Sequence, residues 1–158
     1  MKGEDIMKKI IAMFCVATMC LAFFAGCGSK DVKLDDVISD INSTYSLSLK
    51  TIETSDDLNK YYGIDPDSVK QFAAEIDSNN NAPVEIVLVE AVDSDAAAKI
   101  ETALAARYNS ILSQYASYTP DKLDMVKSCE VTKDGNFVSL IVAENADAML
   151  EDFKKSIE

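Results

Sequence analysis

The sequence predicts an α+β domain in which one small antiparallel sheet of about four strands carries two helices on one face. The apolar, β-branched run VEIVLVEAV over residues 84–92 indicates a central strand that is covered on at least one face. The residues after this run repeat apolar side chains at helical spacing to about Tyr115. Asp134-Gly135 between two apolar runs is a strong hairpin signal. Strands and helices in this order bury their apolar faces in an α+β arrangement.

A helical region is expected before the sheet. Residues 34–45 place Leu34, Val37, Ile38 and Ile41 on one helical face, at spacings of three and four. This pattern is typical of an amphipathic helix that packs on the rest of its domain.

A second, shorter helix is predicted over residues 55–63. Ser55 is its expected N-cap, and Asp56 and Asp57 lie in the first turn, where the helix dipole favours acidic side chains. Gly63 is the expected C-terminal stop.

Residues 69–76 fit either a helix or a strand. The connector over residues 78–82, SNNNA, is rich in turn formers. Residues 69–76 could therefore form an antiparallel partner for the strand over residues 84–92.

The rest of the chain continues this alternation. The expected elements are a helix over 94–115 capped by Asp93 or Ser94, a turn over 119–126 opened by Thr119-Pro120, strands over 128–133 and 136–143, and a helix over 145–157. This order fits either a permuted ferredoxin-like connectivity or two strand-strand-helix units side by side.

Composition excludes several classes of function. The chain of 158 residues has a formal charge of −12 and is 48% hydrophobic, which is typical of a folded domain and disfavours nucleic-acid binding. It contains no His, so Ser-His-Asp and Cys-His catalysis and imidazole metal sites are excluded. No cofactor and no metal is expected.

The N-terminus resembles a bacterial lipoprotein signal. Residues 10–26 carry no charge and follow Lys8-Lys9, as an apolar h-region follows a basic n-region. Phe24-Ala25-Gly26-Cys27 resembles a lipobox, with Phe24 where Leu is more usual. Cleavage is expected between Gly26 and Cys27, with a diacylglycerol thioether on Cys27.

Two other interpretations of this segment are an uncleaved anchor helix, since 17 apolar residues are near the lower limit for spanning a bilayer, and an ordinary cleaved secretory signal. Starting translation at Met7 would remove two acidic residues from the n-region; the intact mass of the precursor tests this. The predicted organisation is a signal peptide over 1–26, a lipidated tether over 27–33 and one domain over 34–158.

Two further features have alternative interpretations. Asp77-Ser78-Asn79-Asn80-Asn81 resembles the start of a calcium loop, but Ala82 and Leu88 stand where Gly and a bidentate Glu are needed, which favours a polar hairpin loop. Cys129 has only Lys127 as a nearby cation in the sequence, so it is interpreted as a buried apolar residue, with intermolecular pairing as the alternative.

The polar residues offer only weak candidates for a binding or catalytic site. Four tyrosines could line a groove for a sugar or a peptide. Tyrosines at the ends of helices and strands, however, usually pack their rings and leave the hydroxyl in contact with water. Arg107, the only Arg of the chain, is expected to find a carboxylate partner, with anion binding as the alternative. Paired acids could suggest acid–base chemistry, but they fall at helix starts and turns, where capping explains them. The tyrosines are Tyr61, Tyr62, Tyr115 and Tyr118, and the acids are Asp35-Asp36, Asp56-Asp57, Asp65 with Asp67, and Asp93 with Asp95.

Several segments together resemble a family of small bacterial lipoproteins catalogued as domain of unknown function 4358. The segments are EIVLVEAVDSDAAAKIETALAARYNSILSQY from residue 85, SYTPDKLDMV, GNFVSLIV, DFKK and, upstream, YGID at residues 62–65. The resemblance covers roughly residues 45–157 and implies a cell-envelope lipoprotein, typically Gram-positive. The family brings no established activity, so no catalytic residue is transferred to this chain.

Three hypotheses follow for the function. The leading one is a non-enzymatic module on the outer face of the cytoplasmic membrane, anchored by the diacylglycerol on Cys27, that binds or supports an envelope protein. The second is an extracytoplasmic binder of a small cationic ligand or basic peptide, because an acidic surface concentrates positive charge. The third is a hydrolase that uses carboxylates alone.

Overall fold

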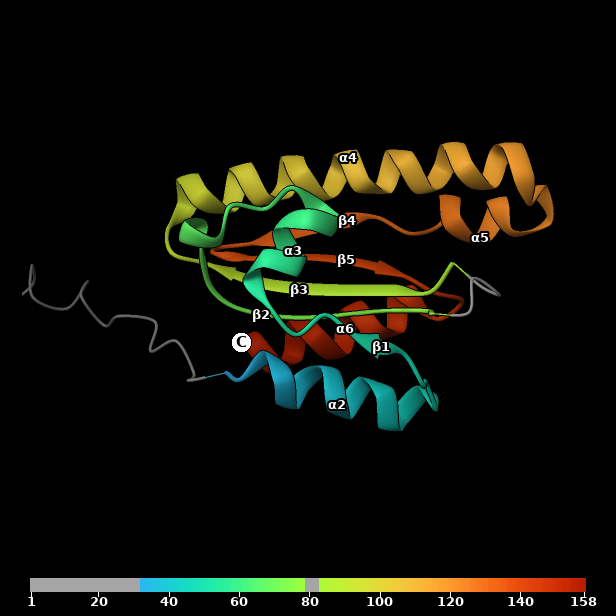
Figure 1. The fold of residues 1–158 in the computed structure, drawn as a ribbon. Helices are drawn as coiled ribbons and strands as arrows, with labels where there is room; N and C mark the ends of the chain where they lie inside the picture. Colours follow the sequence, from blue (N-terminus) through green and yellow to red (C-terminus); the bar gives the residue numbers. More distant parts are fainter. Residues whose placement is uncertain (1–31, 79–82) are drawn as a thin grey trace, which may run out of the picture. The chain divides into compact units, whose positions relative to one another are not determined.

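The computed structural model describes residues 32–78 and 83–158. Within them, one antiparallel sheet has helices on both faces (Figure 1). The elements are α2 (Leu34–Tyr45), β1 (Lys50–Thr51), α3 (Ser55–Tyr62), β2 (Val69–Ile76), β3 (Glu85–Ala91), α4 (Ser94–Tyr118), α5 (Leu123–Lys127), β4 (Val131–Asp134), β5 (Phe137–Val142) and α6 (Ala146–Ile157), with short 3-10 turns at Pro66–Ser68 and Pro120–Lys122.

The predicted fold class is confirmed. The five strands lie in the order β1-β2-β3-β5-β4, and each neighbouring pair is antiparallel. Residues 69–76, which fitted a helix or a strand, form β2 and pair with β3 along their length. The fifth strand, β1, has only two residues, too few to show an alternating pattern in the sequence.

The structure places helices on both faces of the sheet, whereas the sequence predicted two helices on one face. The helix α4 covers one face, while α2 and α6 lie together on the other (Figure 1). Side chains alternate along β3, so Glu85 meets Arg107 of α4, whereas Glu90 meets Gln71 beside the start of α2. All seven residues of β3 are buried, and a strand buried on both faces needs cover on both.

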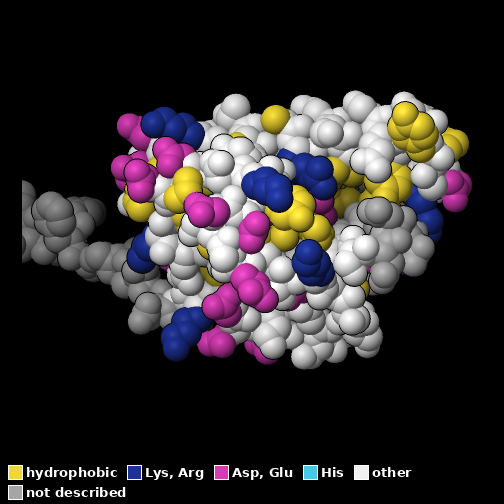
Figure 2. Space-filling model, viewed as in Figure 1, with side chains coloured by type: hydrophobic (Ala, Val, Ile, Leu, Met, Phe, Trp, Pro, Cys, Tyr) yellow, Lys and Arg dark blue, Asp and Glu magenta, His cyan; other side chains and the backbone are white. Residues whose placement is uncertain are grey.

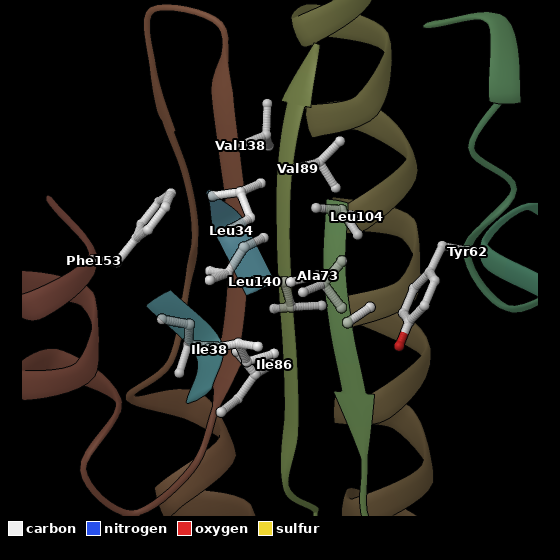
Figure 3. Close-up of a cluster of buried hydrophobic side chains, with 14 of the residues drawn as sticks. Leu34, Ile38, Tyr62, Ala73, Ile86, Val89, Leu104, Val138, Leu140 and Phe153 are labelled. Atoms are coloured by element: carbon white, nitrogen blue, oxygen red, sulfur yellow. The ribbon is translucent and has the colours of Figure 1, made fainter. Parts of the chain in front are cut away.

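The core follows from this layering. Buried side chains of β3 and β5 pack against Leu104 of α4 on one side and against Leu34, Ile38 and Phe153 of α2 and α6 on the other (Figure 3). Phe153 meets Phe137 edge to face, with ring centroids 6.2 Å apart.

Local signals place most element ends. Gly63 ends α3 with a φ of 69°, a backbone conformation that is unfavourable for any residue with a Cβ. Gly135 has a φ of 56° in the predicted hairpin turn between β4 and β5. The side chain of Asp93 caps α4 by accepting from Ala96 N at 2.8 Å, as one of the two expected caps. The expected cap Ser55 is wrong: Thr54 caps α3, and Ser55 is its first helical residue.

In the described part of the chain, no helix has the length and apolar character needed to cross a membrane.

Truncation on either face should destabilise the domain. Leu104 is fully buried and Phe153 is 2% exposed, so Leu104→Ala and Phe153→Ala should each lower the free energy of unfolding by about 3 kcal/mol. Urea unfolding followed by circular dichroism measures this. Tyr118→Ala, at an 83% exposed site, is the control and should stay within about 0.5 kcal/mol of wild type. A loss confined to one of the two core variants would contradict a sheet with helices on both faces.

Candidate functional site

A groove of about 470 Å³ follows the outer edge of β2. It is lined by Val69, Lys70, Gln71, Phe72, Ala73, Ala74 and Glu75 of β2, by Asp35 and Ile38 of α2, and by Thr51, Ile52, Glu53 and Ser55. Seven consecutive strand residues can line one groove only where the groove runs along the edge of the strand, because alternate side chains point to opposite faces.

This edge is open because β1 is short. The strand β1 pairs with β2 only at Glu75 and Ile76, and one further bond runs from Ile52 N to Ala74 O at 2.8 Å. Thr54 then accepts from Asp57 N at 3.1 Å and starts α3, which takes the chain away from β2. Among the described residues, no strand continues the line of β1 beside the remaining part of β2.

The open edge presents main-chain groups. In an antiparallel strand, the N–H and C=O of successive residues point alternately to the two neighbours. Since the Ala74 carbonyl faces β1, Phe72, two residues earlier, directs its N–H and C=O to the same, open side.

The groove has acidic side chains at its rim and in its lining. Asp35 and Glu53 are exposed at its rim, and no basic residue of the described ranges forms a salt bridge with either. Glu75 is 7% exposed and accepts from two neutral donors, Asn42 Nδ2 at 2.7 Å and Thr51 Oγ1 at 3.4 Å.

Lys70 is the one basic residue among the described residues that line the groove, and it pairs with Glu90 at 2.7 Å. Figure 2 shows this side of the molecule, where acidic side chains over α2 and near α3 lie together with dark-blue Lys and Arg side chains.

Gln71 fixes the wall that α2 forms. Its Nε2 donates to Val32 O at 2.7 Å and to Glu90 Oε2 at 2.6 Å, while its Oε1 accepts from Leu34 N at 3.1 Å. The last contact satisfies one of the free N–H groups at the start of α2. One side chain therefore holds the first turn of α2, and with it Asp35, against β2.

Arg107 has the carboxylate partner expected from the sequence. Its Nε and Nη2 donate to the two oxygens of Glu85 at 3.0 and 2.7 Å, a bidentate pair. Hydrogen bonding to Glu85 is the main cause that raises the pKa of Arg107. Because Glu85 is only 6% exposed in its side chain, this pair compensates a buried charge, and its geometry accounts for Arg107 without a bound anion.

The four candidate tyrosines do not share one surface. Tyr62 is 5% exposed, whereas Tyr118, at the end of α4, is 83% exposed. The Arg107 guanidinium lies 6.0 Å from the Tyr62 ring centroid. The Tyr62 hydroxyl has no hydrogen-bond partner among the described residues, and burial is the main cause that raises its pKa.

Cys129, Asp65 and Asp93 make contacts that are typical of structural residues. Cys129 is buried and free, and burial raises the pKa of its thiol. Asp65 and Asp93 accept from nearby main-chain N–H groups, as capping residues do. The described ranges contain no group of three or more His, Cys, Asp or Glu residues that could hold a metal ion. Gly26, Cys27 and residues 79–82 of the polar loop lie outside the described residues.

Sequence reasoning missed the groove, because Asp35, Glu53 and Phe72 come from different elements. A local signal existed in Thr54-Ser55-Asp56-Asp57, which has the spacing of a capping box. Thr54 Oγ1 also donates to Asp57 Oδ2 at 2.8 Å. A helix cap at Thr54 means that any strand before it ends no later than this residue.

Removing the Arg107 side chain should lower the free energy of unfolding, and the size of the loss should depend on Glu85. Arg107→Met leaves a buried carboxylate without its cation, so we expect the free energy of unfolding to fall by about 3 kcal/mol. The double variant Glu85→Gln/Arg107→Met should lose less than the sum of the two single variants, by about 1 kcal/mol or more. Denaturant unfolding of wild type, the two single variants and the double variant measures this coupling. Strictly additive losses would contradict an interaction between Glu85 and Arg107.

Tyr62→Phe should be neutral or stabilising at pH 7, since it removes a buried hydroxyl without a partner. The folded pKa of Tyr62 is raised above its unfolded value of about 10. The unfolded state therefore ionises at a lower pH than the folded state, so the free energy of unfolding falls as the pH rises above about 10. The variant should lose less free energy of unfolding than wild type between pH 9 and pH 11 in urea titrations, whereas equal losses would contradict the burial of this hydroxyl. Tyr118→Phe is the control for hydroxyl removal at pH 7.

Comparison with known proteins identifies a family whose function is unknown. A search of curated proteins and a search of solved structures each returned no match. A family model described as "Domain of unknown function (DUF4358)" matches residues 42–143, which include β1, β2, β3 and the whole of α4. The match covers more than half of the chain, and the protein therefore belongs to the DUF4358 family.

Proposed function

We propose that the protein is a bacterial envelope lipoprotein whose domain binds a partner protein and catalyses no reaction. The observation that carries the binding role is the acidic groove along the open edge of β2. An unpaired strand edge is a template for pairing with another chain.

The proposed anchor is a diacylglycerol on Cys27. It is supported by the uncharged run over residues 10–26 after two lysines and by the small residues before Cys27. Two acyl chains are enough for stable anchoring. A chain with a formal charge of −12 gains no attraction from anionic headgroups, so the lipid alone would hold the domain at the outer face of the cytoplasmic membrane.

A non-catalytic role is supported by the chemistry of the polar residues. The chain has no His, the guanidinium of Arg107 is occupied by Glu85, and the described acids Asp65 and Asp93 serve as caps. The acidic rim also favours the second candidate, binding of a cationic ligand or basic peptide, and both candidates use the same groove.

Crosslinking on intact cells tests the proposal. Wild type is compared with a Cys27→Ser form that carries a cleavable secretory signal, after membrane and soluble fractions are separated. We expect wild type in the membrane fraction with a crosslinked envelope protein identified by mass spectrometry, and the Cys27→Ser form in the soluble fraction. Retention of the Cys27→Ser form on the membrane would contradict the lipid anchor, and failure of both forms to recover a partner would contradict the binding role.

A further inference from the structure

We propose that the groove beside β2 receives an extended, positively charged segment of the partner protein as an added strand. The segment lies end to end with β1 and pairs with the open part of β2. This inference rests on the proposed function and names the chemistry of the partner.

Main-chain geometry supports strand addition. The groove touches β2 from Val69 to Glu75, and β1 pairs with only the last two residues of β2. The open stretch of about five residues is roughly 16 Å long at about 3.3 Å per residue, which accommodates an extended segment of four or five residues. Phe72 supplies an N–H and a C=O that point into this space, so the added strand would form main-chain hydrogen bonds there.

Charge selects the partner. Asp35 and Glu53 lie at the rim, and the buried carboxylate of Glu75 lies in the lining with neutral donors only. Lysine or arginine side chains on an added strand would meet these acids, and complementary charge also speeds encounter. A second copy of this chain is a poorer occupant, because pairing two β2 edges would bring two acidic rims together.

Side chains of the added strand would alternate between two walls. One set would face α2, where Asp35 and Ile38 lie, and the other set would face the start of α3, where Ser55 lies. Glu53 follows the last residue bonded to β2, Ile52, and so lies where the open part of the edge begins. This arrangement favours a segment in which basic residues recur at every second position.

Binding of a synthetic peptide tests the charge. The probe is a fluorescein-labelled nine-residue peptide in which Lys alternates with Val, titrated with the full-length protein in detergent and followed by fluorescence anisotropy. We expect Asp35→Asn/Glu53→Gln to weaken binding about fivefold at low salt, and we expect salt to weaken binding to wild type.

The matched control is Glu130→Gln/Glu151→Gln, which removes the same charge at exposed sites on the β4 side and on α6 and should change binding less than twofold. Equal weakening by the two double variants would overturn the proposed site.

Two further measurements test strand pairing. Phe72→Pro removes an N–H that no strand among the described residues uses, and proline is tolerated at such an edge position. It should abolish peptide binding while the circular dichroism spectrum is kept. The second measurement needs no variant: one peptide is N-methylated on every Lys and another on every Val, and only one of them should bind like the parent peptide. Equal affinity of the two methylated peptides would overturn strand addition.

The outcomes separate this inference from the proposed function. Failure of the peptides to bind, with a partner still crosslinked in cells, overturns strand addition alone. Sedimentation of the full-length protein should show a monomer in detergent, whereas a dimer that Phe72→Pro dissociates would place a second copy on the edge and overturn the basic partner.

Discussion

Burial of β3 on both faces is the constraint on which the rest of this fold depends. All seven residues of the strand are buried, so apolar layers are needed above and below it. The helix α4 provides one layer, and α2 with α6 provides the other. Two carboxylates within the strand, Glu85 and Glu90, add a second requirement, because buried charges need partners. Arg107 on α4 meets the first, and Lys70 with Gln71 on β2 meet the second. Gln71 also bonds Val32 O and Leu34 N, and these further contacts fix the start of α2 beside the edge of β2.

Regular elements with strong local signals were predictable. The helix over residues 34–45, the hairpin turn at Gly135 and the final helix have the expected places, because each combines a clear periodicity with a turn or cap residue. The arrangement of helices on both faces was missed, although the run over residues 84–92 lacks the alternation of a strand with one wet face. Periodicity describes one segment at a time, and which helix covers which face depends on contacts between distant segments.

The candidate site was less predictable for a related reason. A carboxylate partner for Arg107 could be expected from the excess of acids, but its identity depends on strand register that brings together residues 22 positions apart. The groove depends on the point at which β1 ends, and a strand of two residues leaves no pattern to detect. Lipidation of Cys27 rests on the sequence alone and stays a prediction.

The start of α3 controls access to the neighbouring strand. Residues that follow Ile52 could extend β1 along β2, but Thr54 and Asp57 commit them to a helix through their reciprocal hydrogen bonds. Helix and strand thus compete for one short segment, and the capping residues decide the result. Within the family, substitutions at these two positions could lengthen β1 and close the edge without any change in β2. Sequence variation in a helix cap would then tune which relatives can accept an extra strand.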